Sequence, residues 1–306
     1  MRISPTENSR DAVRLLLVLV LTLAGCHPGN KEAKRLRGAC DSGDVKACND
    51  YGQKLLKGEY VLRDDSTAGL KFAQACAGGV AEGCARLGLL YQGGKGIKRD
   101  SARALELFRQ GCDGGALDGC ARLALLYRDG LGVEKDVPHA TRLFDQACSG
   151  GNLIGCAHLG TLYAEGTGLT QDLPRAAELF QRSCDGKIPA GCVGLGRLHT
   201  AGTVVAQNDS LASKLFERAC NDDEAAGCFY LAEQTTAGKG VALDFEAAAQ
   251  LYRRACGGRY ALACYKLADL YEKGAGVGRD PERAASLIRR SCEFGYTEAC
   301  TPARSL

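Results

Sequence analysis

Cysteine is the residue type whose number and spacing first point to chemistry in this chain of 306 residues, which contains 17 cysteines. Sixteen of them form eight C-x7-C pairs, and each pair follows the previous one by 36 residues without an insertion. A fixed period of this length predicts an array of structural repeats. The paired residues are Cys40/Cys48, Cys76/Cys84, Cys112/Cys120, Cys148/Cys156, Cys184/Cys192, Cys220/Cys228, Cys256/Cys264 and Cys292/Cys300.

Such cysteine pairs could bind zinc, perform thiol redox chemistry or form structural disulfides. Structural zinc sites favour about two to four residues between ligands and gather four ligands, which the C-x7-C spacing does not fit. Catalytic thiols usually occur as C-x-x-C, and the sequence contains no such motif. We therefore expect structural disulfides. Pairing within each C-x7-C is the simplest of the many possible connectivities, and the repeat requires every unit to be closed in the same way.

The N-terminal segment predicts export and a lipid anchor. A charged leader precedes the apolar run Leu15–Leu23, which is too short to span about 30 Å of hydrocarbon. The following Leu23-Ala24-Gly25-Cys26 resembles the lipobox of bacterial lipoproteins, which implies cleavage after residue 25 and acylation of Cys26. Several acyl chains, such as palmitate, would hold the chain firmly at a membrane, and export delivers it to a compartment where disulfides persist. The alternative is a plain secretory signal followed by a chance cysteine.

Composition and charge exclude several classes of protein. Hydrophobic residues make up 45% and charged residues 25% of the chain, which is ordinary for a folded soluble protein and argues against disorder. The 39 basic and 36 acidic residues give a formal net charge of +3. This balance provides no broad cationic field, so we expect no nucleic-acid partner.

The segment from Ala116 to Gly151 shows how one period folds. Apolar residues at helical spacing predict a first helix over 118–129, which Gly130 and Gly132 end. Asp136 is a candidate N-cap for a second helix that Cys148 closes. Three marks recur in all seven periods. The loop glycines are Gly58, Gly94, Gly130, Gly166, Gly202, Gly238 and Gly274. The N-caps are Asp64, Asp100, Asp136, Asp172, Asn208, Asp244 and Asp280. The small helix–helix contacts are Ala68, Ala104, Ala140, Ala176, Ala212, Ala248 and Ala284.

These marks predict an all-α solenoid of seven helix-pair repeats. We place a signal peptide at 1–25, a lipidated tether and half-repeat at 26–43, the repeats at 44–295 and a stub at 296–306. Within the repeats, Leu87-Gly88-x2-Tyr91 and Ala104-x3-Phe108 look like the signature of TPR-type helix pairs. The period and the linker Gly94–Asp100 resemble the Sel-one-like repeat family, and the C-x7-C pairs resemble its cysteine-rich secreted branch, first known as Helicobacter cysteine-rich proteins.

That resemblance implies a right-handed α/α superhelix. It also implies that one cysteine of each pair ends the second helix of a repeat while its partner begins the first helix of the next repeat. Some members of the cysteine-rich branch are described as penicillin-binding or β-lactamase-like. Such a cell-wall hydrolase is the alternative function.

No catalytic or cofactor motif accompanies the repeats. The four histidines do not pair at H-x-H or H-x3-H spacing, so we expect no metal site. G-x-S-x-G, the phosphate-binding G-x4-G-K-[ST], S-x-x-K and K-T-G are all absent from the sequence. We therefore expect no catalytic residue, no cofactor and no enzymatic activity.

The best candidate for a functional surface is the face formed by the first helices. In TPR-like arrays these helices line a concave surface, which is the usual means of binding in solenoids. The cysteine, leucine and tyrosine stripe of each first helix must face the packed side, which leaves a second stripe for binding. Its candidate residues are Arg86, Arg122, His158, Arg197, Tyr230 and Lys266. We expect a lipid-anchored scaffold or adaptor in the bacterial envelope, periplasmic or at the outer membrane. Its partner would be a protein or peptide with acidic or C-terminal carboxylate groups.

Overall fold

The computed structural model describes residues 28–300, and the chain divides into two compact units between Asp136 and Val137. The described residues form fifteen α-helices and no strand. The first unit contains α2 (Pro28–Asp41), α3 (Val45–Lys57), α4 (Asp65–Ala77), α5 (Ala81–Gly93), α6 (Ser101–Asp113) and α7 (Leu117–Asp129). The second contains α8 (Val137–Ser149), α9 (Leu153–Glu165), α10 (Leu173–Asp185), α11 (Pro189–Ala201), α12 (Asp209–Asn221), α13 (Ala225–Ala237), α14 (Phe245–Gly257), α15 (Ala261–Lys273), α16 (Pro281–Glu293) and the 3₁₀-helix η1 (Thr297–Cys300).

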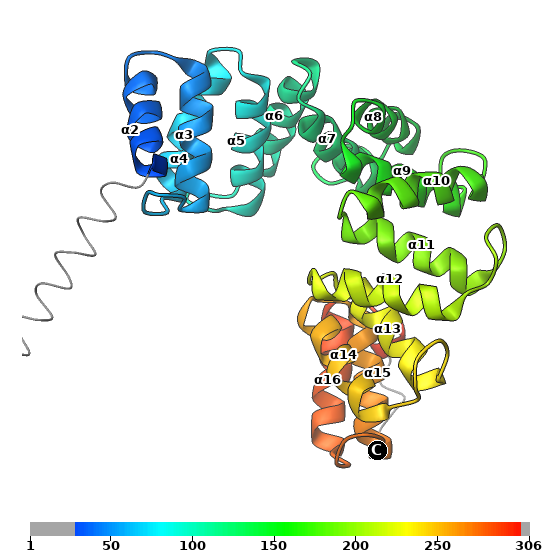
Figure 1. The fold of residues 1–306 in the computed structure, drawn as a ribbon. Helices are drawn as coiled ribbons and strands as arrows, with labels where there is room; N and C mark the ends of the chain where they lie inside the picture. Colours follow the sequence, from blue (N-terminus) through cyan, green and yellow to red (C-terminus); the bar gives the residue numbers. More distant parts are fainter. Residues whose placement is uncertain (1–27, 301–306) are drawn as a thin grey trace, which may run out of the picture. The chain divides into compact units, whose positions relative to one another are not determined.

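Helix pairs are the building block of both units. Within each unit every helix packs against the next one along the chain, as the succession of hairpins in Figure 1 shows. The odd-numbered helices from α3 onward are the first helices of the repeats, and the even-numbered helices from α4 onward are the second helices. First helices of neighbouring repeats also contact each other, for example α5 with α7 and α11 with α13. The predicted all-α architecture of stacked helix pairs is therefore confirmed.

Local sequence chemistry sets both ends of the loop inside each repeat. All seven loop glycines cap the C-terminus of a first helix in the left-handed conformation, as at Gly94 with φ 64°. This conformation favours glycine because it has no Cβ. Six of the predicted N-caps accept a hydrogen bond from a backbone N–H of the second helix. At Asp100, for example, Oδ1 accepts from the N–H of Arg103 at 2.9 Å.

The core lies between the two helices of each pair. The repeated alanines, such as Ala68 and Ala140, are at most 1% exposed. Phe108 on α6 is fully buried against Gly88 of α5, where an added Cβ would lie 2.8 Å from the phenyl ring. Small residues on the first helix therefore make room for a large side chain on the second helix. This complementarity fixes the spacing of the pair.

The described segment begins with a helix that precedes the first repeat. Helix α2 begins at Pro28 and lies within the segment predicted as a lipidated tether and half-repeat at 26–43. Ala33, Leu36 and Cys40 form an apolar face that packs in the core, and Pro28 is compatible with the first helical position. The predicted signal peptide, Cys26 and residues 301–306 lie outside the described residues. Across residues 28–300, no helix combines the length and apolar character that a membrane span requires.

Candidate binding surface

The disulfides hold consecutive repeats together. Each C-x7-C forms one bridge, with Cα–Cα distances of 4.5–5.0 Å. Cys76 lies at the end of α4 and its partner Cys84 at the start of α5, so the bridge closes the turn between repeats. This is the pairing and placement that the sequence and the family resemblance predicted.

Burial limits what the bridged cysteines can do. The second cysteine of the first seven pairs lies in the opening turn of a first helix and is at most 2% exposed. These residues are Cys48, Cys84, Cys120, Cys156, Cys192, Cys228 and Cys264. They were singled out as site residues by their spacing, but they lie in the packed layer, where neither a partner nor a substrate can reach them. They support the helices that form the surface and are not part of the surface itself. Cys300 differs, because it is exposed on η1.

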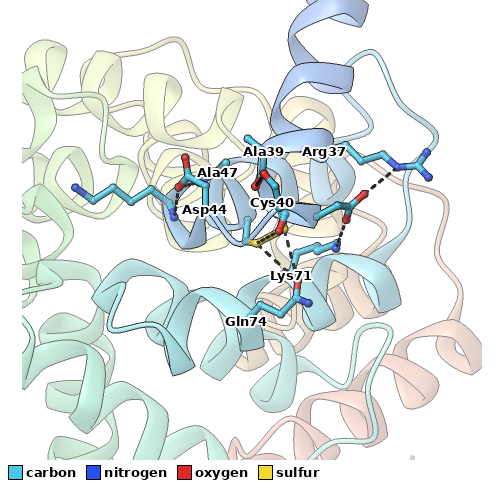
Figure 2. Close-up of a disulfide and its surroundings, with 11 residues drawn as sticks. Arg37, Ala39, Cys40, Asp44, Ala47, Lys71 and Gln74 are labelled. Atoms are coloured by element: carbon cyan, nitrogen blue, oxygen red, sulfur yellow. Dashed lines mark hydrogen bonds and ion pairs between the residues drawn. A yellow bond between two sulfur atoms is a disulfide. The ribbon is translucent and has the colours of Figure 1, made fainter.

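A polar side chain from the following second helix lies over several of these bridges. In the first unit it is glutamine, and Gln74 Oε1 lies 3.5 Å from Cys40 Sγ. Figure 2 shows this side chain beside the disulfide. In the second unit it is arginine, and Arg182 Nη1 lies 3.9 Å from Cys148 Sγ. Arg218 Nη1 lies 3.8 Å from Cys184 Sγ. The disulfides of the two units thus differ in the charge beside their sulfur atoms.

In the first unit, the first helices α3, α5 and α7 form the layer that carries Arg86 and Arg122. Arg86 is half-buried, and its Nη1 donates to Oδ1 of Asn49 on α3 at 2.7 Å. Asn49 is 7% exposed, so this bond satisfies a buried amide. Arg122 on α7 is half-buried and has no hydrogen-bond or ion-pair partner within residues 28–300. Arg122 is therefore the side chain of this pair whose charge is available to a ligand.

In the second unit, Arg197 and Tyr230 of the predicted stripe come together. The guanidinium carbon of exposed Arg197 on α11 lies 5.5 Å from the ring centre of Tyr230 on α13. The Tyr230 ring also stacks on Phe216 at 5.3 Å and meets the edge of Phe229 at 5.2 Å. Phe229 stacks in turn on Tyr260 at 4.6 Å. We call Arg197, Phe216, Phe229, Tyr230 and Tyr260 the aromatic cluster.

Glu233 neutralises the next cation on this face. Lys266 Nζ lies 3.2 Å from Oε2 of Glu233, and the hydroxyl of Tyr252 donates to the other carboxylate oxygen. Burial raises the pKa of Tyr252 above its ordinary range, and the bond to Glu233 raises it further. Burial likewise raises the pKa of Tyr260, which lies beside Tyr230. Lys266 is thus part of an internal ion pair.

The predicted run of available positive charge is therefore interrupted. His158 packs its ring 5.2 Å from Phe144, Arg86 is bound to Asn49, and Lys266 is paired with Glu233. Arg122 and Arg197 keep accessible guanidinium groups, each within its own unit. Phe229 and Tyr260 were not among the predicted binding residues. The position after the second cysteine of each pair is alanine in repeats 2 to 4, and its change to Phe229 was the available signal.

In the part of the chain that the structure describes, no three His, Cys, Asp or Glu side chains gather in a way that could hold a metal ion.

Stacked helix pairs with a bridged turn after each repeat define an α/α repeat solenoid. The Sel1 repeat profile matches seven segments, and this chain belongs to that family. The segments are 45–79, 81–115, 117–152, 153–187, 189–223, 225–257 and 261–296. Sel1 repeat proteins are generally protein-interaction scaffolds, and most of them are non-catalytic.

Two solved structures with TM-scores above 0.5 have the same fold. A protective antigen of uropathogenic Escherichia coli with an SLR fold matches at a TM-score of 0.59 and 25% identity, covering 87% of this chain and 57% of that one. This chain thus spans just over half the length of that relative. A Sel1 repeat protein from Oxalobacter formigenes has a TM-score of 0.66 at 18% identity, covering 80% of this chain and 96% of that one, and shows the fold alone. Helicobacter pylori cysteine rich protein B is 26% identical over 44% of this chain and 97% of its own, with a TM-score of 0.35. A search of the curated proteins found no match.

Proposed function

We propose that this chain is a lipid-anchored scaffold of the bacterial envelope that binds a protein or peptide on its first-helix layer. Two features support the compartment. Eight disulfides persist best outside the reducing cytoplasm, and Cys26 follows a lipobox-like sequence after a short apolar run. The anchor itself rests on sequence alone.

The main observation that supports the proposed binding site is the stacking of Arg197 on Tyr230 within the aromatic cluster. Arginine and tyrosine are enriched among residues that dominate interface energetics. A guanidinium held over a ring keeps its hydrogen-bond donors free at its edge, which suits a carboxylate. The partner would therefore present a carboxylate beside an apolar or aromatic group. Arg122 offers a similar guanidinium on the first-helix layer of the first unit.

Site-specific crosslinking tests this site in cells. A photoreactive residue at Arg197 or Tyr230 should capture a discrete envelope partner, and the same residue at Arg175 on the second helix α10 should not. Once that partner is purified, Arg197→Ala and Tyr230→Ala should each weaken its binding by about tenfold, or about 1.4 kcal/mol. Arg175→Ala is the matched control, because Arg175 is also an exposed arginine. Equal capture from both faces, or unchanged affinity of folded variants, would place the site elsewhere.

Arg86→Ala is unsuitable as a probe of binding in this layer. Its removal leaves the buried Oδ1 of Asn49 without its donor, so a loss of binding could reflect a loss of packing.

Fractionation tests the anchor separately. Cys26→Ser should release the folded chain from the membrane fraction, because the repeats begin well after residue 26. If the variant remains in the washed membrane fraction, the anchor assignment is wrong. Hydrolysis of a chromogenic β-lactam by the purified chain would favour the alternative enzymatic function, and we expect none.

A further inference from the structure

A cationic hollow lies on the second-helix side of the last complete repeat, away from the first-helix residues discussed above. Helices α14 and α16 form its walls, and Leu267 of α15 contributes to its lining from between them. The hollow has a volume of about 400 Å³, which is within the range of small-molecule sites. The lining residues that define its chemistry are Arg253, Cys256, Leu267, Arg283, Leu287 and Arg290.

Three arginines and no carboxylate line this hollow. Arg253 comes from α14, while Arg283 and Arg290 come from one face of α16 at i and i+7. None of the three forms an ion pair with an acidic side chain within residues 28–300. Three like charges that gather without a counter-ion repel one another, so an anion in the hollow would relieve that repulsion.

Aromatic side chains hold these guanidinium groups in place. Nη2 of Arg253 donates to the hydroxyl of Tyr271 at 3.1 Å, and the Arg283 guanidinium carbon lies 5.0 Å from the centre of the same ring. The Arg290 guanidinium carbon lies 5.2 Å from the ring of Phe294. Because contacts with rings and a phenol use little of the hydrogen-bonding capacity of arginine, most N–H groups remain for a ligand. Their partial ordering reduces the entropy lost on binding.

The apolar part of the lining defines the other half of the ligand. Leu267 is 2% exposed and Leu287 is half-buried, and the Cys256 disulfide adds a further apolar surface. Burial of a hydrocarbon group there would contribute about 25 cal/mol per Å² of apolar area removed from water. The hollow thus combines an anion-binding rim with an apolar floor.

The preceding groove of the same unit serves as an internal comparison. One period earlier, Glu217 and Ala247 stand where Arg253 and Arg283 stand in the last groove. Arg254, which corresponds to Arg290, donates to the backbone oxygen of Cys220 at 2.6 Å and lies 3.5 Å from Asp223. In the earlier groove, Arg254 therefore has a backbone and a carboxylate acceptor. In the last groove, which has the same backbone architecture, three arginines have no acidic partner.

A second hollow in this unit has a different character. It has a volume of about 550 Å³, and its lining combines Lys187, Lys214 and Arg218 with Glu217 and Asp222. Its cations face carboxylates within the same lining, so it offers a weaker site for an anion.

From these contacts we infer that the hollow between α14 and α16 binds an amphiphilic anion, a carboxylate or phosphate that carries an apolar group. The arginines would bind the anionic head, since guanidinium groups match carboxylate and phosphate oxygens bidentately. Leu267 and Leu287 would contact the apolar group. This site is separate from the proposed protein-binding face and does not depend on it.

Calorimetric titration of the folded chain with octanoate, octyl phosphate and octylammonium tests the proposal. The two anions should bind, and octylammonium, which has the same tail and the opposite charge, should not. The triple variant Arg253→Gln/Arg283→Gln/Arg290→Gln should bind the anions about tenfold more weakly. Arg289→Gln is the matched control because Arg289 is exposed on α16 but does not line the hollow. It should change affinity by less than about twofold. Circular dichroism should confirm that all variants keep their helical content.

Competition distinguishes the source of the anion. Vesicles of phosphatidylglycerol that displace octyl phosphate would identify a lipid headgroup as the ligand, whereas failure to displace it would favour a free small anion. The proposal is overturned if the folded triple variant binds as well as the parent chain. It is also overturned if octylammonium binds as well as octanoate, or if neither anion binds at concentrations up to about 1 mM.

Discussion

Glutamine lies over two disulfides of the first unit, and arginine at the same repeat position lies over two disulfides of the second unit. Gln110 Oε1 is 3.4 Å from Cys76 Sγ, whereas Arg218 Nη1 is 3.8 Å from Cys184 Sγ. The turns between repeats differ as well. The left-handed residue of that turn is always glycine in the first unit, at Gly43, Gly79 and Gly115. In the second unit it is glycine only at Gly151 and Gly295, and Lys187, Asp223 and Arg259 adopt this conformation at the other turns.

The residue after the second cysteine shows the same trend. It is Asn49, Ala85 and Ala121 in the first unit, but Val193, Phe229 and Tyr265 in the later repeats of the second. The backbone period is identical in both units, because the cysteines, the buried alanines and the loop caps are retained. The comparison shows that this framework accommodates changes at other positions. In the second unit these changes place arginine over two bridges and Phe229 and Tyr265 after two of the cysteines.

The largest expected effect concerns what the two units share. Removing one bridge in each unit, as Cys76→Ala/Cys84→Ala and as Cys220→Ala/Cys228→Ala, should lower the local stability by about 2.5 kcal/mol in both cases. The cause is the same, since both bridges close a loop of equal length in the unfolded chain. Hydrogen exchange followed by mass spectrometry can measure the loss in the adjoining helices.

Alanine is the appropriate replacement because these cysteines are at most 6% exposed, and serine would bury a hydroxyl. A loss confined to one unit would show that its bridges do more than restrict the unfolded chain.

The second expected effect is a loss of stability at alkaline pH that occurs in the second unit. The pKa values of Tyr252 and Tyr260, both in the second unit, are raised by burial, so the folded state retains their protons after the unfolded chain has lost them. Their contribution is complete below about pH 10 and is lost as pH rises above it, by less than about 1.4 kcal/mol per pH unit for each residue because solvent screens part of the effect. Denaturant titrations at pH 9 and pH 11 should show this loss as a lower free energy of unfolding of the second unit.

Tyr252→Phe/Tyr260→Phe should reduce this alkaline loss, because phenylalanine has no proton to release. An equal loss in the double variant would assign the alkaline sensitivity to other groups.

The fold could be predicted from sequence because its determinants are local and repeated. Gly94 and Asp100 each set a helix end through their own backbone or side chain, and the same chemistry recurs in every period. Which residues of the predicted binding stripe on the first helices are accessible to a ligand could not be predicted in this way. Arg86 meets Asn49, and Lys266 meets Glu233, across neighbouring repeats. Such pairs depend on how one repeat stacks on the next, which helical periodicity does not specify.

The cationic hollow could not be predicted from the sequence for the same reason. Arg253 and Arg283 lie on different helices, and their convergence depends on the packing of α14, α15 and α16. By contrast, the change from alanine to Phe229 was visible in the aligned repeats, so part of the aromatic cluster could have been found.

The third expected effect concerns the rate at which the bridges are reduced. A guanidinium beside a sulfur stabilises the thiolate that reduction produces, and it also attracts an anionic thiol reductant. Cys184–Cys192 should therefore open about five to ten times faster than Cys76–Cys84. Both bridges are buried, so the comparison is not dominated by access. Cys292–Cys300 is outside this comparison because Cys300 is exposed, and it should open first.

Timed alkylation with peptide mapping measures these rates. Arg218→Gln should slow the opening of Cys184–Cys192 to the rate of Cys76–Cys84. If the rates are already equal in the parent chain, the charge beside the sulfur has no effect on reduction.

The smallest expected effect lies in the turns between repeats. Lys187 has a φ of 63° and Gly79 a φ of 84°, and a Cβ at position 79 would meet no atom within 4 Å. The left-handed conformation costs a residue with a Cβ about 1 kcal/mol, while glycine raises the entropy of the unfolded chain and offsets about half of that. Lys187→Gly should therefore stabilise the second unit by about 0.5 kcal/mol, and Gly79→Lys should destabilise the first by a similar amount. Gly115→Ala separates the backbone cost from the long side chain, because its Cβ also has open space. Guanidinium denaturation of the three variants should give one gain and two losses. A loss in Lys187→Gly would mean that the lysine side chain stabilises its turn by more than its backbone conformation costs.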